Sequence, residues 1–101
     1  PHYANELMAM FMASLTQTLA EIESALTLRD RVRLRRVVHS LKSSAATVGA
    51  VELAALAEAN EYRLRKGLEP APELYKVMSQ AVSRLRLALP DDLTGETTSV
   101  N

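Results

Sequence analysis

The sequence lacks cysteine and tryptophan, and its aromatic side chains are limited to one phenylalanine and three tyrosines. The absence of cysteine excludes disulfides, thiol catalysis and cysteine-ligated metal sites, and it fits a reducing cytoplasm. With so few aromatic residues, a core must be built from leucine, valine, alanine and methionine. Glycine and proline are also scarce, with three and four copies among 101 residues. This composition is typical of an all-α protein.

Long hydrophobic runs and net charge are missing as well. No apolar run is long enough to cross a bilayer, and no signal peptide is visible. Twelve basic and twelve acidic residues give a formal net charge of zero, so the overall charge predicts no acidic partner. One segment is nevertheless crowded with basic residues, namely Arg29, Arg31, Arg33, Arg35, Arg36 and Lys42. The chain begins with proline rather than methionine, so we expect a piece of a longer protein.

Four amphipathic segments with a helical period follow one another, at about residues 4–26, 31–48, 50–66 and 72–89. Asp30 is placed to cap the second segment, and Gly49 and Gly67 are placed to end the second and the third. Pro72 suits the first turn of the fourth segment, and Pro90 ends it.

The short connections predict how these helices pack. Helices joined by short loops lie antiparallel, so residues 1–90 are predicted to form one domain, an antiparallel up-down four-helix bundle. Residues 91–101 are polar and aperiodic, which predicts a flexible, disordered tail. The apolar stripes of the four segments give the expected core: Leu7, Phe11, Leu15, Leu19, Ile22, Leu26; Leu34, Val37, Val38, Leu41, Ala45, Val48; Leu53, Leu56, Ala57, Asn60, Leu64; Leu74, Val77, Met78, Ala81, Leu85, Leu89.

His39 lies on the opposite face of the second segment from its apolar stripe. At about 100° per residue, it sits on the order of 150° from the centre of that stripe. Its neighbours on the outward face are basic or short: Arg35, Arg36, Lys42, Ser43 and Ala46. An exposed imidazole on a rigid helix with such neighbours is well placed to exchange a phosphoryl group with a partner.

The run from His39 to Ala50, HSLKSSAATVGA, resembles the signature of histidine-containing phosphotransfer (HPt) domains. That signature is, loosely, His-x-Leu-Lys-Gly-Ser-(Ser/Ala)-x-x-x-Gly, usually followed by a small or apolar residue. The matching residues are His39, Leu41, Lys42, Ser44, Ala45, Gly49 and Ala50. The likeness in helix pattern extends over about residues 5–89. Two positions depart from the family: Ser43 replaces the usual glycine, and Val38 stands where alanine is frequent. Neither change removes the nucleophile.

The resemblance implies a phosphorelay carrier of two-component signal transduction. In the family, the histidine accepts a phosphoryl group from the aspartyl phosphate of a receiver domain and passes it to the aspartate of another response regulator. Such a domain binds no ATP and does not phosphorylate itself, and the receiver supplies the Mg²⁺, so no cofactor or metal is expected here. By position, His39 is the phosphoryl carrier and Lys42 the cation beside it. Glu61 would accept a hydrogen bond from the imidazole Nδ1 and leave Nε2 free.

The outward face also predicts a partner. Because receiver active sites are acidic, Arg35 and Arg36 are expected to help docking, together with the short side chains of Ser43 and Ala46. We expect a cytoplasmic domain that is monomeric in isolation and makes no contact with membrane or nucleic acid. It would be either a free-standing shuttle or the end of a hybrid sensor histidine kinase, and the sequence leaves that choice, the signal and the partners open.

Two other functions stay open on the residues alone. A nucleic-acid-binding domain using the arginine-rich segment would bind random duplex DNA in a salt-dependent way. A purely structural or interaction bundle with an incidental histidine would keep its function after His39→Gln. A dimerising histidine-kinase hairpin is disfavoured, because Ser40 follows His39 where those domains carry an acidic residue.

Overall fold

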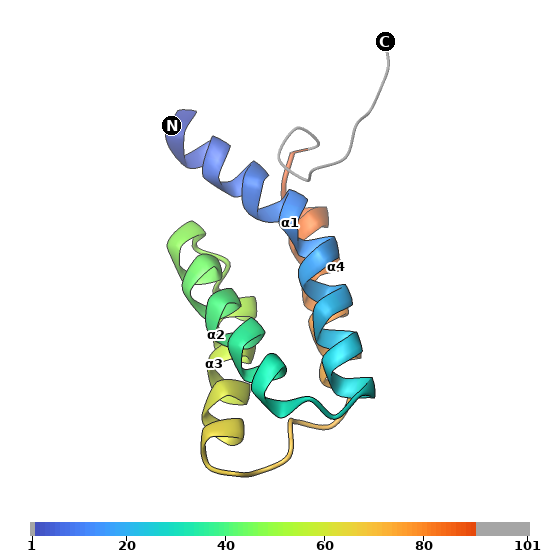
Figure 1. Ribbon diagram of the computed structural model, residues 1–101. Coiled ribbons are helices and arrows are strands. Elements are labelled where there is room, and N and C mark those ends of the chain that lie inside the picture. The colour runs from blue at the N-terminus through green and yellow to red at the C-terminus, as the bar shows by residue number, and fades with distance from the viewer. Residues whose placement is uncertain (1, 91–101) are drawn as a thin grey trace.

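The computed structural model describes residues 2–90, so the tail expected at residues 91–101 lies outside the described part. Four helices alternate in direction (Figure 1). They are α1 (His2–Thr27), α2 (Arg31–Val48), α3 (Val51–Arg65) and α4 (Leu74–Ala88). No strand occurs between residues 2 and 90. The predicted all-α class and antiparallel four-helix bundle are confirmed.

The helix α2 has the bounds that its end signals predicted. The carboxylate of Asp30 accepts a hydrogen bond from the backbone N–H of Arg33 at 3.0 Å and so caps the first turn. At the other end, Gly49 adopts a left-handed conformation with φ of 79°. Its N–H and that of Ala50 donate to the carbonyls of Ala46 and Ala45, which closes the last turn. Both ends of α2 are therefore fixed by local chemistry.

The start of α4 differs from the prediction. Pro72 precedes the helix instead of lying in its first turn, because Glu73 adopts a left-handed conformation with φ of 56° and α4 begins at Leu74. The reason lies in α3, where the buried Asn60 accepts a hydrogen bond from the N–H of Ala71 at 2.8 Å. That bond ties the loop to α3, so the chain turns through Pro72 and Glu73 before the helix can begin.

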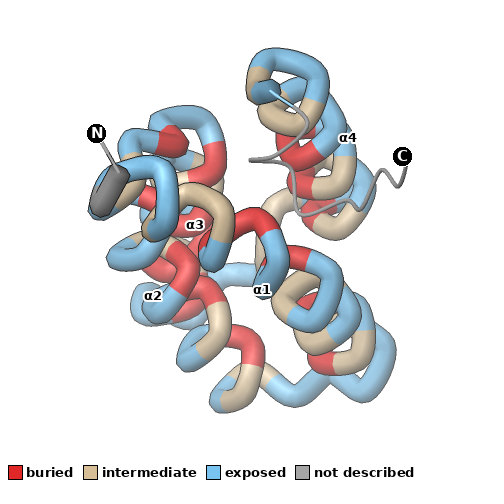
Figure 2. Tube along the Cα trace, turned by 90° about the horizontal axis from the view of Figure 1, so that it is seen from above, coloured by how far each residue is buried: buried red, intermediate tan, exposed pale blue. Residues whose placement is uncertain are grey.

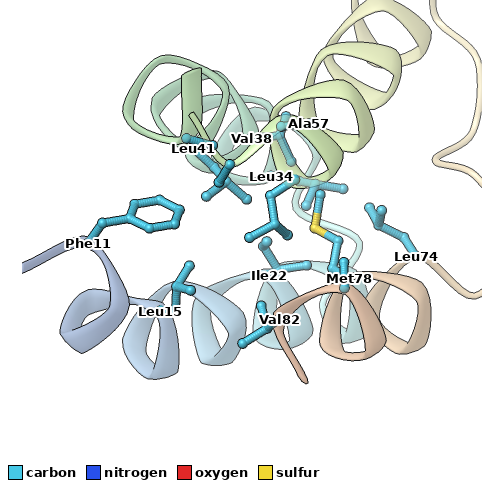
Figure 3. Packing of buried hydrophobic residues seen from close by; sticks show 14 of the residues in the cluster. Phe11, Leu15, Ile22, Leu34, Val38, Leu41, Ala57, Leu74, Met78 and Val82 are labelled. Atoms are coloured by element: carbon cyan, nitrogen blue, oxygen red, sulfur yellow. The ribbon is translucent and has the colours of Figure 1, made fainter. Parts of the chain in front are cut away.

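The core lies between the inner faces of all four helices (Figure 2). Each helix packs against its neighbours in the chain, and α4 also packs against α1. Among the predicted core residues, Leu34 of α2 lies near Ile22 of α1, and Val38 of α2 lies near Ala57 of α3 (Figure 3). Half-buried members of the predicted stripes surround the core. Met12, on the flank of the first stripe, is buried as well, and the other buried residues outside the stripes are Ala25, Ala50, Glu61 and Val82.

None of the helices within residues 2–90 is long and apolar enough to span a bilayer.

Candidate functional site

His39 lies near the middle of α2, on the side that faces away from the core. The preceding residue, Val38, is fully buried, and helical geometry therefore turns His39 outward. The His39 side chain is 60% exposed. Because α2 is capped at both ends and packed along its inner face, this exposed ring stands on a rigid support.

Glu61 of α3 supplies a carboxylate to the imidazole. Its Oε2 lies 2.5 Å from Nδ1 of His39, although the glutamate side chain is only 8% exposed. An ionised carboxylate can only accept hydrogen bonds, so Nδ1 carries the proton and donates it. In the neutral ring, the other nitrogen, Nε2, then carries the free lone pair, and the side chain is largely open to solvent.

Lys42 completes this arrangement from one turn farther along α2. Its Nζ lies 2.7 Å from Oε1 of Glu61, so the two oxygens of one carboxylate serve two side chains of the neighbouring helix. The hydrogen bond from Lys42 is the largest influence on the pKa of Glu61 and lowers it, the contact with His39 lowers it further, and burial acts in the opposite direction. The net effect is a lowered pKa, which keeps Glu61 ionised at neutral pH.

A shallow groove with a volume of about 420 Å³ opens beside the imidazole. Its lining residues are Val32, Arg35, Arg36, His39 and Glu61. Arg35 and Arg36 are exposed, and neither forms an ion pair with another described residue. The groove thus places two uncommitted cations next to the histidine. The helix pair α2 and α3 that builds it also has the most extensive contact in the bundle.

No group of three or more potential metal ligands occurs in the described part of the chain. A larger pocket, about 730 Å³, lies at the end of the bundle between the α1–α2 turn and the α3–α4 loop, and its lining does not include His39. The exposed histidine with its buried carboxylate is therefore the strongest candidate site.

The chain matches the family model of the Hpt domain over residues 6–88. It belongs to the Hpt family. Hpt domains carry out histidine phosphotransfer in two-component phosphorelays, and they interact with receiver domains. No curated protein and no solved structure matches this chain.

The structure of this Hpt domain brings three of the singled-out side chains into one hydrogen-bonded group: His39, Lys42 and Glu61. The other four do not join it. Arg35 and Arg36 line the groove on the N-terminal side of the histidine, and Ser43 and Ala46 are exposed on its C-terminal side.

Three features of the Hpt site were missed from the sequence. The direct contact between Lys42 and Glu61 was not expected, nor was Val32, which is 75% exposed at the edge of the groove. A signal for Val32 existed, because it precedes His39 by seven residues and so lies on the same helix face. The burial of Glu61 also had a signal, since Ala57 and Leu64 place it on an apolar stripe.

Proposed function

We propose that this Hpt domain carries a phosphoryl group on Nε2 of His39, taking it from the aspartyl phosphate of one receiver domain and passing it to the aspartate of another. The observation that carries this proposal is the buried Glu61 carboxylate 2.5 Å from Nδ1 of an exposed ring. Burying a charge costs free energy unless it is paired and hydrogen-bonded. An incidental surface histidine would give no reason to bury a carboxylate against its ring.

The transfer step needs no proton to leave the imidazole. The lone pair of Nε2 attacks phosphorus, the Nε2–P bond forms, and the bond from phosphorus to the aspartyl oxygen breaks and returns its electron pair to the carboxylate. Nδ1 keeps its proton, so the phosphorylated ring is an imidazolium whose charge faces Glu61. The same steps in reverse deliver the group to the next receiver. Mg²⁺ on the receiver would neutralise the moving oxygens.

In this mechanism Lys42 acts through Glu61. Its ammonium lies 2.7 Å from the carboxylate and lowers the pKa of Glu61, so the hydrogen-bond acceptor for Nδ1 stays ionised. Lys42 is therefore proposed as a positioning residue.

The receiver would dock on the face around His39. Arg35 and Arg36 offer positive charge to an acidic receiver site, and Ser43 and Ala46 allow a close approach. Val32 adds an exposed apolar side chain at the edge of this face. We propose that the domain works as a monomer in the cytoplasm, where it meets its receivers one at a time.

The test is phosphoryl transfer from a phosphorylated receiver domain to the wild-type chain and to His39→Gln, with the acid lability of the product. An acid-labile, base-stable phosphate that disappears in His39→Gln is the expected result. Helical content and thermal unfolding of the variant serve as the folding control, because an exposed residue is replaced. A folded wild-type chain that takes no phosphate from any receiver of a broad panel would contradict the proposal and favour the structural bundle.

A further inference from the structure

Phosphorylation of His39 changes the charge of a site that is balanced beforehand. In the free site, the negative charge of Glu61 is matched by Lys42, and the imidazole that attacks phosphorus must be the neutral form, because only that form has a lone pair on Nε2. If His39 is the phosphoryl carrier, as proposed above, transfer adds one net negative charge, because a phosphoryl dianion is joined to an imidazolium. Some cation has to face this added charge.

Lys42 is poorly suited to that task. Its ammonium is already 2.7 Å from Oε1 of Glu61, and that glutamate side chain is only 8% exposed. If Lys42 turned to the phosphoryl group, the buried carboxylate would lose the contact that most lowers its pKa. Glu61 would then keep only its hydrogen bond from His39, and losing a hydrogen bond at a buried carboxylate costs free energy, so we expect Lys42 to stay with Glu61.

The groove beside the imidazole offers two other cations. Arg35 and Arg36 precede His39 by four and three residues, positions whose Cβ atoms lie about 5–6 Å from that of the histidine on a helix. Both line the groove together with His39, whereas Lys42 does not. The neighbouring arginines are occupied, since Arg31 donates to the carbonyls of Leu64 and Leu68 and Arg33 donates to Ser24.

We propose that Arg35 and Arg36 form the binding site for the phosphoryl group on Nε2 of His39, while Lys42 remains with Glu61. Guanidinium groups present paired N–H donors that match phosphoryl oxygens. They stabilise the loaded form of the carrier, because they hold the dianion without competing for the buried carboxylate.

The experiment loads the protein without any receiver. Phosphoramidate donates its phosphoryl group to Nε2 as its own P–N bond breaks and ammonia leaves. The second pKa of the phosphoryl group is then measured by ³¹P NMR titration in wild type, Arg35→Gln, Arg36→Gln, the double variant and Lys42→Gln. Lys76→Gln is the matched control, because it removes one exposed cation from α4. Since the chain has only two histidines, His39→Gln identifies any signal from His2.

We expect the phosphoryl pKa to rise by about 0.3–1 unit in the double variant, by less in each single variant, and not at all in Lys76→Gln. Spontaneous hydrolysis should also be faster in the double variant. The same pKa in the double variant and in Lys76→Gln would overturn the inference. A larger rise in Lys42→Gln than in the double variant would also overturn it, because Lys42 would then be the phosphoryl ligand. So would a wild-type chain that phosphoramidate leaves unphosphorylated at His39.

This design separates the inference from the proposed relay. An arginine-dependent phosphoryl pKa in a chain that exchanges nothing with receivers would count against the relay alone. Normal exchange with receivers and an arginine-independent pKa would count against the inference alone.

Discussion

Two carboxylates of α3 contact cations on neighbouring helices, and they differ in burial. The Glu61 side chain is 8% exposed and contacts Lys42 and His39 of α2. The Glu52 side chain is 51% exposed, and its oxygens lie 2.5 and 3.2 Å from two guanidinium nitrogens of Arg84 on α4. Both glutamates have a lowered pKa, caused first by the hydrogen bond from their cation.

This difference in burial shows that contact geometry alone does not reveal which of the two ion pairs, Lys42–Glu61 or Arg84–Glu52, serves a function. The exposed pair has the two-pronged arrangement that favours a strong contact, yet water and salt screen it. The buried carboxylate is an expensive way to join two helices, because its desolvation offsets much of the attraction. What distinguishes Glu61 is that its second oxygen holds the ring of His39. The buried group is therefore better explained by the histidine than by stability.

The largest expected effect contrasts Glu61→Gln with Glu52→Gln. Both substitutions keep the shape of the side chain and remove its charge. We expect Glu61→Gln to slow phosphorylation of His39 by about 10–100-fold, because the imidazolium that forms loses the carboxylate facing it. Glu52→Gln should leave the rate unchanged. The measurement is the initial rate of phosphorylation by phosphoramidate.

Unfolding in urea provides the control for that comparison, since both variants must remain folded. If Glu61→Gln and wild type were phosphorylated at equal rates, Glu61 would have no role in orienting His39. Its contacts with Lys42 and His39 would then be structural only.

The second comparison removes the cations. Lys42→Met keeps an unbranched stem and leaves a buried carboxylate without the partner that most lowers its pKa. We expect the free energy of unfolding to fall by about 1–3 kcal/mol. Arg84→Met leaves an exposed carboxylate that water solvates, so its loss should be clearly smaller. Urea denaturation at neutral pH measures the free energy of unfolding of both variants. Equal falls in Lys42→Met and Arg84→Met would contradict the idea that burial makes the loss larger.

The third comparison uses pH. The pKa of Glu61 is lowered in the folded protein from its ordinary value of 4.5, so the stability it contributes is present above that value. That contribution is lost as the pH falls through the folded pKa. The free energy of unfolding of wild type should therefore fall relative to that of Glu61→Gln as the pH is lowered below about 4.5. Urea denaturation at stepped pH measures it, and a difference that stays constant would contradict the lowered pKa.

The fold could be predicted where its determinants are local. Asp30 and Gly49 fixed both ends of α2 because a cap and a left-handed glycine act on their own turn. The turn at Glu73 could not be predicted, because it depends on a hydrogen bond between Asn60 and Ala71, eleven residues apart. Its cause is tertiary, and no local pattern around Pro72 contains it.

The candidate site follows the same division. Helical period places His39 outward and Lys42 beside it, and the family resemblance supplied a partner for Nδ1. The contact between Lys42 and Glu61 depends on how α2 and α3 are rotated against each other, which the sequence does not specify. The groove beside Arg35 likewise exists only once the two helices are packed.

The smallest expected effect is the dependence of two coupling energies on salt, that of Lys42 with Glu61 and that of Arg84 with Glu52. Double-mutant cycles combine Glu61→Gln with Lys42→Met and Glu52→Gln with Arg84→Met, so that each isolates one coupling energy. At about 1 M salt the screening length falls to about 3 Å, and the coupling of the exposed pair should largely vanish. The buried pair should keep most of its coupling, because little solvent reaches Glu61. If both couplings fell by the same fraction, salt would have to reach Glu61 as readily as Glu52. The Glu61 carboxylate would then be hydrated, and its hydrogen bond with Nδ1 of His39 would be no stronger than that of a surface glutamate.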